Sequence, residues 1–515
     1  MALIQPLQND DILREVFRVC HFRLEDDSTN VSDGPDLKDL ARSARVCKAF
    51  SEHALDTLWS DLDKVLPLLK VLTTSFALVQ ENDSRSTYNL RGSIPEAELL
   101  RFRHYAKRVH EITVDYEKEQ ISPSVFAIIA HFTRGTPLFT SLSRLIWRQS
   151  HPLGSELLLF TSPSLLHFKV HAHSALPINQ DSTFNLVMSI LASSIPSLQS
   201  LDVHAAVHRL PVMQDIAQLR CLRKLSITCP VSARSVVANL AGMEKLAEII
   251  LALDTSEING MPSRSGFLPL GHLQIIGGRL SGVKHILQAI DPATPLQSFE
   301  LHCLDPLRKA TRELNSILAM LSQAERINSM RRIGIYCDFV HELVDYSRYM
   351  DVLQPLQCLQ FLEDVQVTFG APAVSFTDDD IRDMTKSWPR LITLIANYSE
   401  GNIISISSLL EFALHCPDLR ELSLTNGRLG GLPSIDLETV PILSHGLHML
   451  EICHDWHECT PDHIRQCALF LYRIFPNIED CRCVGHHGAP PMVYELLADF
   501  QSVRKMELAR VGNMK

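Results

Sequence analysis

Cysteine and histidine side chains that could bind a metal ion gather near the carboxyl end of the sequence. They form two groups, Cys453, His454, His457 and Cys459, then Cys481, Cys483, His486 and His487. Thiolates and imidazoles suit zinc, and the two groups could converge on one ion. Their spacings are not those of a zinc finger or ribbon, and Cys481 and Cys483 stand at apolar strand positions, where a buried thiol acts as a small hydrophobic side chain. We therefore favour structural cysteines and expect no metal.

Patterns that would indicate catalysis are absent from the sequence. Two glycine-rich stretches, residues 277–282 and 427–431, fit neither a phosphate-binding loop nor a dinucleotide fingerprint. Gly-x-Ser-x-Gly and His-Glu-x-x-His do not occur. With 13 Cys and 23 His, distant Cys–His pairs are expected by chance and single out no nucleophile. We therefore expect a chain that is not an enzyme and needs no cofactor. The alternative is an enzyme whose site is inserted in the loops.

The composition indicates a folded protein whose partners are other proteins. Its 515 residues exceed what one compact core supports, which favours several domains or a repeat array. A net charge of −11 without a long Lys or Arg run disfavours nucleic acid and anionic membranes as partners. The irregularly spaced cysteines favour a reducing compartment. Residues 1–11 lack secretory-signal features, and no apolar stretch is long enough to cross a bilayer, so we expect an intracellular protein, cytoplasmic or nuclear.

From about residue 105 a Leu-x-x-Leu-x-Leu pattern recurs, with other apolar residues as substitutes. Its starts are Val109, Leu142, Leu165, Leu198, Leu222, Leu246, Leu270, Leu296, Met330, Leu362, Leu391, Leu419, Leu447, Ile478 and Val503, of which Leu391 and Ile478 are poor copies. The spacing lies within or near the roughly 20–29 residues of leucine-rich repeats. Helical stretches are expected between the strands, at 185–192, 235–241, 314–321 and 403–415. The pattern predicts an α/β fold in which a curved, irregular leucine-rich-repeat-like solenoid occupies residues 106–515.

Residues 1–75 show helical periodicity instead. Asp10 and Asp11 can cap a first helix, and the polar stretch 25–36 indicates a loop. Helical spacing then resumes from Leu37 to Leu62. We expect a small helical domain at residues 1–75 and a connecting helical segment at 76–105. So small a domain hardly buries its apolar surface alone, and it therefore needs a partner or packing against the repeats.

Two stretches of this helical head resemble an F-box. Residues 7–17 are similar to its opening, typically Leu-Pro-x-Glu-Ile-Leu-x-x-Ile-Phe. Residues 40–50, followed by Leu58-Trp59, are similar to its second half, where a Val-Cys-Lys-x-aromatic segment and a Leu-Trp pair recur. The whole chain resembles the F-box proteins with degenerate leucine-rich repeats that abound in mushroom-forming fungi. It departs from their pattern at Gln8, where Pro is usual, and in the inserted stretch 25–36.

The resemblance implies a role in ubiquitin ligation. In that family the F-box docks on the Skp-type adaptor of an SCF-type cullin–RING ligase, and the repeats hold the protein to be ubiquitinated. The docking helices and their core would comprise Leu7, Ile12, Leu13, Phe17, Val46, Cys47, Phe50 and Trp59. The implied function is substrate recognition, to which the chain contributes proximity. The alternative is an interaction scaffold unlinked to ubiquitin, in which the head only caps the solenoid.

The same strand alternation selects candidate residues for binding the unknown protein substrate. Side chains beside an inward-pointing Leu pair face out from the sheet. They are Arg144, Arg148, His167, Lys169, His171, Asp202, His204, Lys224, Glu300, His302, Glu421 and Glu451. Histidine and charged side chains on neighbouring strands can hold a peptide by hydrogen bonds and ion pairs. The alternative is that they are the solvated face of a sheet.

Overall fold

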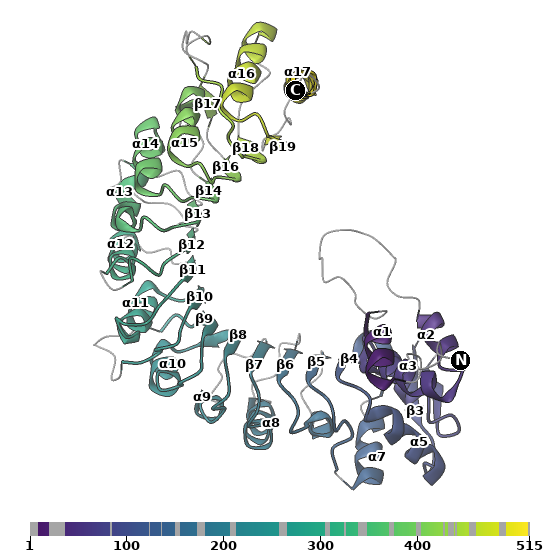
Figure 1. Ribbon diagram of the computed structural model, residues 1–515. Helices are drawn as coiled ribbons and strands as arrows, with labels where there is room; N and C mark the ends of the chain where they lie inside the picture. The colour runs from purple at the N-terminus through teal and green to yellow at the C-terminus, as the bar shows by residue number, and fades with distance from the viewer. Residues whose placement is uncertain are drawn as a thin grey trace. The chain divides into compact units, whose positions relative to one another are not determined.

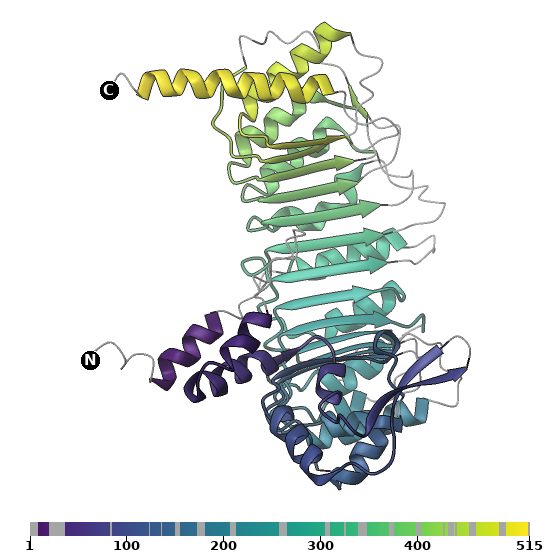
Figure 2. The ribbon, with the colours of Figure 1, turned by 90° about the vertical axis from the view of Figure 1, so that its right-hand side faces the viewer.

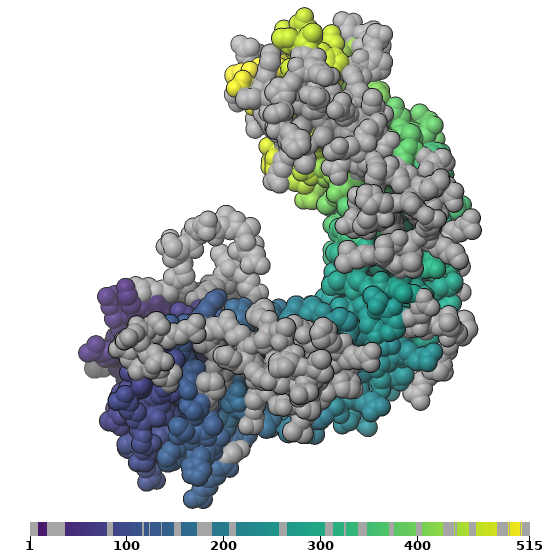
Figure 3. Space-filling view, turned by 180° about the vertical axis from the view of Figure 1, so that it is seen from behind, coloured from purple at the N-terminus to yellow at the C-terminus, as the bar shows by residue number. Residues whose placement is uncertain are grey.

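A computed structural model describes most of the chain as two compact units, residues 1–229 and 230–515. The described residues are 9–19, 37–82, 85–122, 124–134, 136–149, 155–172, 181–205, 213–256, 265–303, 310–323, 326–337, 348–369, 375–397, 403–425, 428–430, 437, 440–452, 460–483 and 491–512. They are coloured in the space-filling view of Figure 3. We call the two parts the first and the second unit and describe each by itself.

The first unit begins with three helices, α1 (Asp10–Val19), α2 (Leu37–Ser43) and α3 (Lys48–Ser60). They share a core of Phe17, Leu40 and Ala54, on which Ala44, Phe50 and Leu58 pack. The Asn9 side chain caps α1 by accepting from the backbone N–H groups of Asp11 and Ile12. Asp10 and Asp11 occupy the first turn of α1. The prediction that these two residues cap the helix is therefore wrong.

The segment after α3 differs from the helical connection expected at residues 76–105. Leu62 ends a two-residue strand, β1 (Asp61–Leu62), and does not extend a helix. After α4 (Leu66–Leu69) the chain forms an antiparallel hairpin, β2 (Phe76–Asn82) and β3 (Arg85–Leu90). Only then does α5 (Glu96–Ala106) begin. The hairpin buries Phe76 and stacks its ring on Tyr88, with ring centroids 5.2 Å apart.

A parallel sheet follows, with the strand order β1–β4–β5–β6–β7–β8. Its further strands are β4 (Glu111–Asp115), β5 (Arg144–Gln149), β6 (His167–Ala172), β7 (Ser200–Ala205) and β8 (Lys224–Val231), the last of which spans the boundary of the units. The returns contain α6 (Tyr116–Glu119), α7 (Ser124–Thr133), the 3-10 helix η2 (Ser155–Phe160), α8 (Asp181–Ser194) and α9 (Met213–Ile216). Figure 1 shows α8 and α9 on the same side of these strands.

The second unit repeats the same arrangement, with the strand order β9–β10–β11–β12–β13–β14–β16–β18–β19 and every described pair parallel. These strands are β9 (Glu248–Leu253), β10 (His272–Ile276), β11 (Ser298–Cys303), β12 (Arg332–Cys337), β13 (Asp364–Phe369), β14 (Thr393–Asn397), β16 (Glu421–Thr425), β18 (Met449–Ile452) and β19 (Asp480–Cys483). In Figure 2 they run as parallel arrows. A small parallel pair, β15 (Ile403–Ser405) and β17 (Arg428–Gly430), accompanies them.

Helices connect the strands of the second unit. They are α10 (Ala233–Leu240), α11 (Leu280–Ala289), α12 (Ala310–Leu321), α13 (Tyr349–Leu353), η4 (Gln354–Cys358), α14 (Asp378–Ser387), η5 (Ile406–Ser408), α15 (Leu409–His415), α16 (Pro461–Ile474) and α17 (Pro491–Gly512). Figure 1 shows α10 to α15 on one side of the strands. A capping box starts α14, since the Thr377 side chain accepts from the N–H of Asp380, and the Asp380 carboxylate accepts from Thr377 N–H.

The repeat pattern places every long-sheet strand from β4 to β19. Each begins two residues after a predicted start, from Val109 before Glu111 to Ile478 before Asp480. All these starts are buried, including the poor copies Leu391 and Ile478. The expected parallel sheet of strand-and-return repeats is thus present in each unit. Val503 is the exception, because it lies half-exposed within α17 and starts no strand.

The helical stretches predicted between strands are largely correct. Residues 185–192, 235–241 and 314–321 fall in or against α8, α10 and α12. The stretch 403–415 is wrong in its first half, because β15 and η5 precede α15 there. Among the described helices, none combines the length and apolar content that a membrane span requires.

Candidate protein-binding surfaces

Strands β5 to β8 present a polar face opposite the one packed into the core. The inward side chains Leu145, Trp147, Phe168, Val170, Leu201, Val203, Leu225 and Ile227 are buried. The outward side chains alternate with them and are partly exposed, as predicted for Arg144, Arg148, His167, Lys169, His171, Asp202, His204 and Lys224. We call these eight residues the basic face. The register aligns Arg148, His171 and His204 on adjacent strands, and likewise Lys169 and Asp202.

Ion pairs hold the acidic groups on and beside the basic face. Lys169 Nζ lies 2.9 Å from Asp202 Oδ2, and His204 Nε2 lies 2.8 Å from Asp202 Oδ1. On the neighbouring strand β4, Glu111 Oε2 lies 3.6 Å from Arg144 Nη1. Asp202 therefore has two partners, Lys169 and His204, whereas Glu111 has only Arg144 among the described residues. The negative charge of Asp202 is thus more completely compensated than that of Glu111.

Two histidines of the basic face stack on each other. The rings of His171 and His204 are nearly parallel, with centroids 4.6 Å apart. Burial, helped by the nearby His204 and Lys169, lowers the pKa of His171 from 6.5 to about 4. Burial and the charge of Arg144 lower the pKa of His167 in the same direction. At neutral pH the His171 ring is a neutral hydrogen-bonding group, while the fixed positive charge of the face comes from Arg and Lys.

The predicted residues of the second unit do not form one cluster. Glu300 and His302 lie on β11, whereas Glu421 lies on β16 and Glu451 on β18, with β12, β13 and β14 between them. Glu451 accepts a 2.5 Å hydrogen bond from the Ser423 hydroxyl. All four are at least partly exposed. The second unit therefore offers two separate polar areas on its sheet.

A polar ladder beside His302 was missed by sequence reasoning. The His302 ring stacks on Tyr336 with centroids 4.3 Å apart, and Gln274 Nε2 lies 3.3 Å from His302 Nε2. The Tyr336 hydroxyl donates to Gln366 Oε1. Burial lowers the pKa of His302 and raises that of Tyr336. A simple signal existed, because His302 and Tyr336 both follow their repeat start by the same offset.

The predicted adaptor-docking residues occupy three different environments. Leu13 and Phe17 are buried, and Phe50 packs on their core. Ile12, Val46 and Cys47 are exposed, and the Cys47 thiol accepts from Phe50 N–H at the start of α3. Trp59 packs against Tyr105 of α5 with ring centroids 4.6 Å apart. Leu7 lies outside the described residues.

The head carries a set of exposed apolar side chains, which we call the head apolar residues. They are Ile12, Val16, Leu37 and Val46, with 43%, 51%, 51% and 68% of their surface exposed. Ile12 and Val16 are one helical turn apart on α1 and therefore share a face. Exposed apolar groups on a small domain mark a surface that can bury area against another protein.

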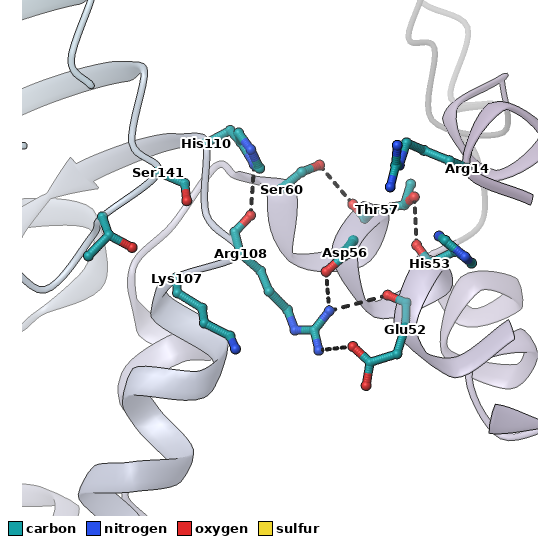
Figure 4. Close-up of a pocket in the computed structure, with 11 residues that line it drawn as sticks. Arg14, Glu52, His53, Asp56, Thr57, Ser60, Lys107, Arg108, His110 and Ser141 are labelled. Carbon is teal, nitrogen blue, oxygen red and sulfur yellow. Dashed lines mark hydrogen bonds and ion pairs between the residues drawn. The ribbon is translucent and has the colours of Figure 1, made fainter. Parts of the chain in front are cut away.

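A buried arginine joins the head to the first repeat (Figure 4). The Arg108 side chain is only 4% exposed; its guanidinium lies 2.6 Å from Glu52 Oε2 and also donates to Asp56 of α3. It donates a further bond of 3.2 Å to the Glu52 carbonyl. His110 N–H donates to the Ser60 carbonyl, and β1 pairs with β4. These contacts fix α3 against the repeat.

An open cavity of about 700 Å³ lies beside this junction (Figure 4). It is lined by Arg14, Glu52, His53, Asp56, Thr57, Ser60, Lys107, Arg108, His110, Thr140 and Ser141. Its two carboxylates already bind Arg108, and the Thr57 and Ser60 hydroxyls donate to main-chain carbonyls. The polar groups that α3 contributes to the cavity wall are therefore already engaged.

Two buried cysteines, Cys229 and Cys416, have the character of structural thiols. Burial raises the pKa of Cys229 and of Cys416 to about 12, so neither thiol ionises at neutral pH. No group of three or more metal-binding side chains occurs among the residues that the structure describes. Of the predicted Cys/His groups, residues 453–459 and 486–487 lie outside that part of the chain, while Cys481 and Cys483 lie in β19.

Comparisons with known proteins add little to this geometry. No protein-family model and no curated protein matches the chain. Among solved structures, a crystal structure of a TLR13–ssRNA13 complex matches with 12% sequence identity and a TM-score of 0.36. The match covers 68% of this chain and spans half of that chain's length. So distant a likeness carries no argument about partner or activity, and the functional interpretation rests on the surfaces described above.

Proposed function

We propose that this chain is a non-catalytic substrate-recognition adaptor of an SCF-type cullin–RING ubiquitin ligase. In this proposal the helical head binds a Skp-type adaptor, and the sheet face of the repeats binds the protein to be ubiquitinated. The chain supplies binding and proximity, and the partner ligase supplies the chemistry.

The head apolar residues carry the first part of the proposal. The head is small, yet it leaves Ile12, Val16 and Val46 exposed while Leu13 and Phe17 fill its core. A helix with one apolar face inside and a second one outside is expected to bury the outer face against a partner. The resemblance of the head to an F-box, given above, is the reason for proposing a Skp-type protein as that partner.

A second function is favoured by the way the head joins the sheet. Helix α3 leads directly into β1, which pairs with β4, and Arg108 of the repeat binds two carboxylates of α3. A head built in this manner covers the end of a repeat array whether or not it binds an adaptor. An interaction scaffold unlinked to ubiquitin is therefore the competing proposal.

Binding to a purified Skp-type adaptor tests the two proposals against each other. Isothermal titration with the full chain is compared with Ile12→Glu/Val46→Glu, which places charge on the exposed head surface without disturbing the core. The matched control is Leu78→Glu/Leu100→Glu, which alters equally exposed apolar residues of β2 and α5. We expect the head variant to lose binding and the control to keep it. If the folded wild-type chain does not bind, the scaffold proposal replaces the ligase proposal.

A further inference from the structure

The basic face opposes the charge of the protein that carries it. The chain has a net charge of −11. The outward positions of β5 to β8 nevertheless hold Arg144, Arg148, Lys169 and Lys224 against the single acid Asp202. A local excess of cations on an acidic protein is not explained by composition, and it creates a local positive potential.

Two cations of this face are also more accessible than its one acid. The Lys169 and Arg144 side chains are 40% and 43% exposed, whereas Asp202 is 18% exposed beneath its two partners. Arg148 forms no ion pair with any acidic side chain in the described part of the chain. An approaching molecule therefore meets guanidinium and ammonium groups first.

The histidines of the face report the same potential. Burial lowers the pKa of His171, and the charges of Lys169 and Arg148 lower it further against the opposing effect of Asp202. Arg144 acts in the same way on His167. Burial is the larger cause at both sites, and the smaller contribution of the neighbouring cations has the sign that a positive local potential gives.

We propose that the basic face binds an acidic segment of a partner protein, with carboxylate or phosphate groups at Arg148 and Lys169. Ile146 lies partly exposed between Arg144 and Arg148 on β5, so an apolar residue flanked by acidic ones fits best. The inference uses the proposed function only in taking the sheet face as the target-binding surface.

Nucleic acid fits this face less well than an acidic peptide. Binding a phosphate backbone requires a long run of cations and aromatic rings open for base stacking. Here Glu111 and Asp115 stand on the adjoining strand β4, and His171 and His204 stack on each other. Four cations on the three strands β5, β6 and β8 suit a short anionic segment.

The sheet of the second unit provides an internal contrast. Its described outward side chains include Glu248, Glu300, Asp364, Glu421, Glu451 and Asp480, with Arg332 as their cationic counterpart. Arg332 Nε lies 2.7 Å from Asp364 Oδ2 and is thereby engaged. An acidic segment is repelled there, which restricts the proposed binding to the first unit.

Selection from a displayed library of short random peptides on the full-length protein tests the proposal. The charge-reversal variant is Arg148→Glu/Lys169→Glu. The matched control, Arg101→Glu/Arg103→Glu, makes the same net change on exposed positions of α5. We expect wild type and control to enrich net-acidic peptides and the reversal variant to lose that enrichment. Enrichment without net negative charge, or equal loss in both variants, overturns the proposal.

Anisotropy titrations then measure the affinity of synthetic probes. An enriched acidic peptide, its phosphoserine counterpart, a lysine-rich peptide and a single-stranded RNA of mixed sequence are compared. We expect the reversal variant to bind the acidic peptide at least about tenfold more weakly, and added salt to weaken wild-type binding. The phosphoserine arm separates the two sources of negative charge. RNA binding that the reversal variant loses, without peptide binding, overturns the proposal.

Measuring the binding of the Skp-type adaptor to the same variants distinguishes failure of this proposal from failure of the proposed function. The reversal variant leaves the head unchanged, so it should bind the Skp-type adaptor as wild type does. Loss of acidic-peptide binding with retained adaptor binding supports both proposals. Peptide binding without adaptor binding supports this inference and removes the ligase role.

Discussion

At the junction between the head and the first repeat, removing Arg108 and removing its two carboxylate partners should destabilise the protein to different extents. Arg108 is buried, whereas the side chains of its partners Glu52 and Asp56 are 66% and 56% exposed. The variant Arg108→Met leaves two carboxylates that water can solvate. The variant Glu52→Gln/Asp56→Asn leaves a buried guanidinium without any anion. The second change should therefore be the more destabilising one, although both break the same ion pairs.

The magnitudes follow from the two environments. An uncompensated buried charge costs about 3–5 kcal/mol. The variant Arg108→Met should cost about 1–2 kcal/mol. Most of this comes from the lost packing of the longer arginine side chain, because the two exposed carboxylates are then solvated by water. At about 1.4 kcal/mol per factor of ten, local opening of α3 should rise more than a hundredfold in the acid variant and roughly five- to thirtyfold in Arg108→Met.

Hydrogen–deuterium exchange of the α3 amides, followed by mass spectrometry, measures this opening. Arg103→Met on the exposed surface of α5 is the control and should leave α3 exchange unchanged. The hydrogen bond and charge of Arg108 lower the pKa of Glu52, so this part of the stability is present above the ordinary pKa of Glu and is lost as pH falls through the lowered value. Exchange that is equal in both variants, or faster in Arg108→Met, would refute the reasoning.

Three further predictions concern other sites. In a proton NMR titration, His171 should titrate near pH 4. Because the same histidine in the unfolded chain binds its proton near pH 6.5, the first unit should lose stability as the pH falls from 6.5 to about 4. The variant His171→Gln should lose less stability over this interval. Asp380→Ala should lower the free energy of unfolding by about 3 kcal/mol in urea, because the buried carboxylate accepts from Met350 N–H and Thr377 N–H; an unchanged midpoint would contradict this. Gly278→Ala should cost more than about 1 kcal/mol, since φ is +73° and a Cβ would lie 2.5 Å from that of Leu253, whereas Gly242→Ala, with open space, should be close to neutral in the same thermal melt.

The strands could be predicted because their signal is local and repeated. In the copy Leu222, Leu225, Ile227, all three side chains are fully buried, and the burial requirement recurs in each neighbour. Leu391 was a poor copy by sequence, yet the small Ala396 fills the last inward position of its strand. The register of the sheet and the composition of its outward face then follow from simple alternation.

The same spacing predicts a repeat start at Val503, and this prediction is wrong because Val503 lies in helix α17. Residues three apart also share a face of a helix, so Val503 and Met506 fit α17 as well as they fit a strand. Both are half-exposed or more, which shows that no sheet covers them. Local patterns alone do not separate these two cases.

The head junction and the stacked histidines could not be predicted, because their partners are far apart in sequence. Arg108 binds residues more than fifty positions earlier, and no periodicity relates them. The stacking of His171 on His204 depends on strand register across a return of irregular length. Such contacts become visible only when the fold brings the strands together. The division of the F-box-like residues between core, surface and junction has the same origin.

The short strand β1 has a consequence for how copies of this chain meet. Parallel sheets have an edge where backbone groups lack partners, and such edges recruit other chains. Here β1 pairs only Asp61 with Glu111 and Leu62 with Ile112, which sets two carboxylates side by side at the margin. Like charges on a two-residue strand offer a poor template for a further strand. A fragment that starts after β1 would expose β4 along its whole length, and we expect it to pair edge to edge with a second copy where the complete unit does not.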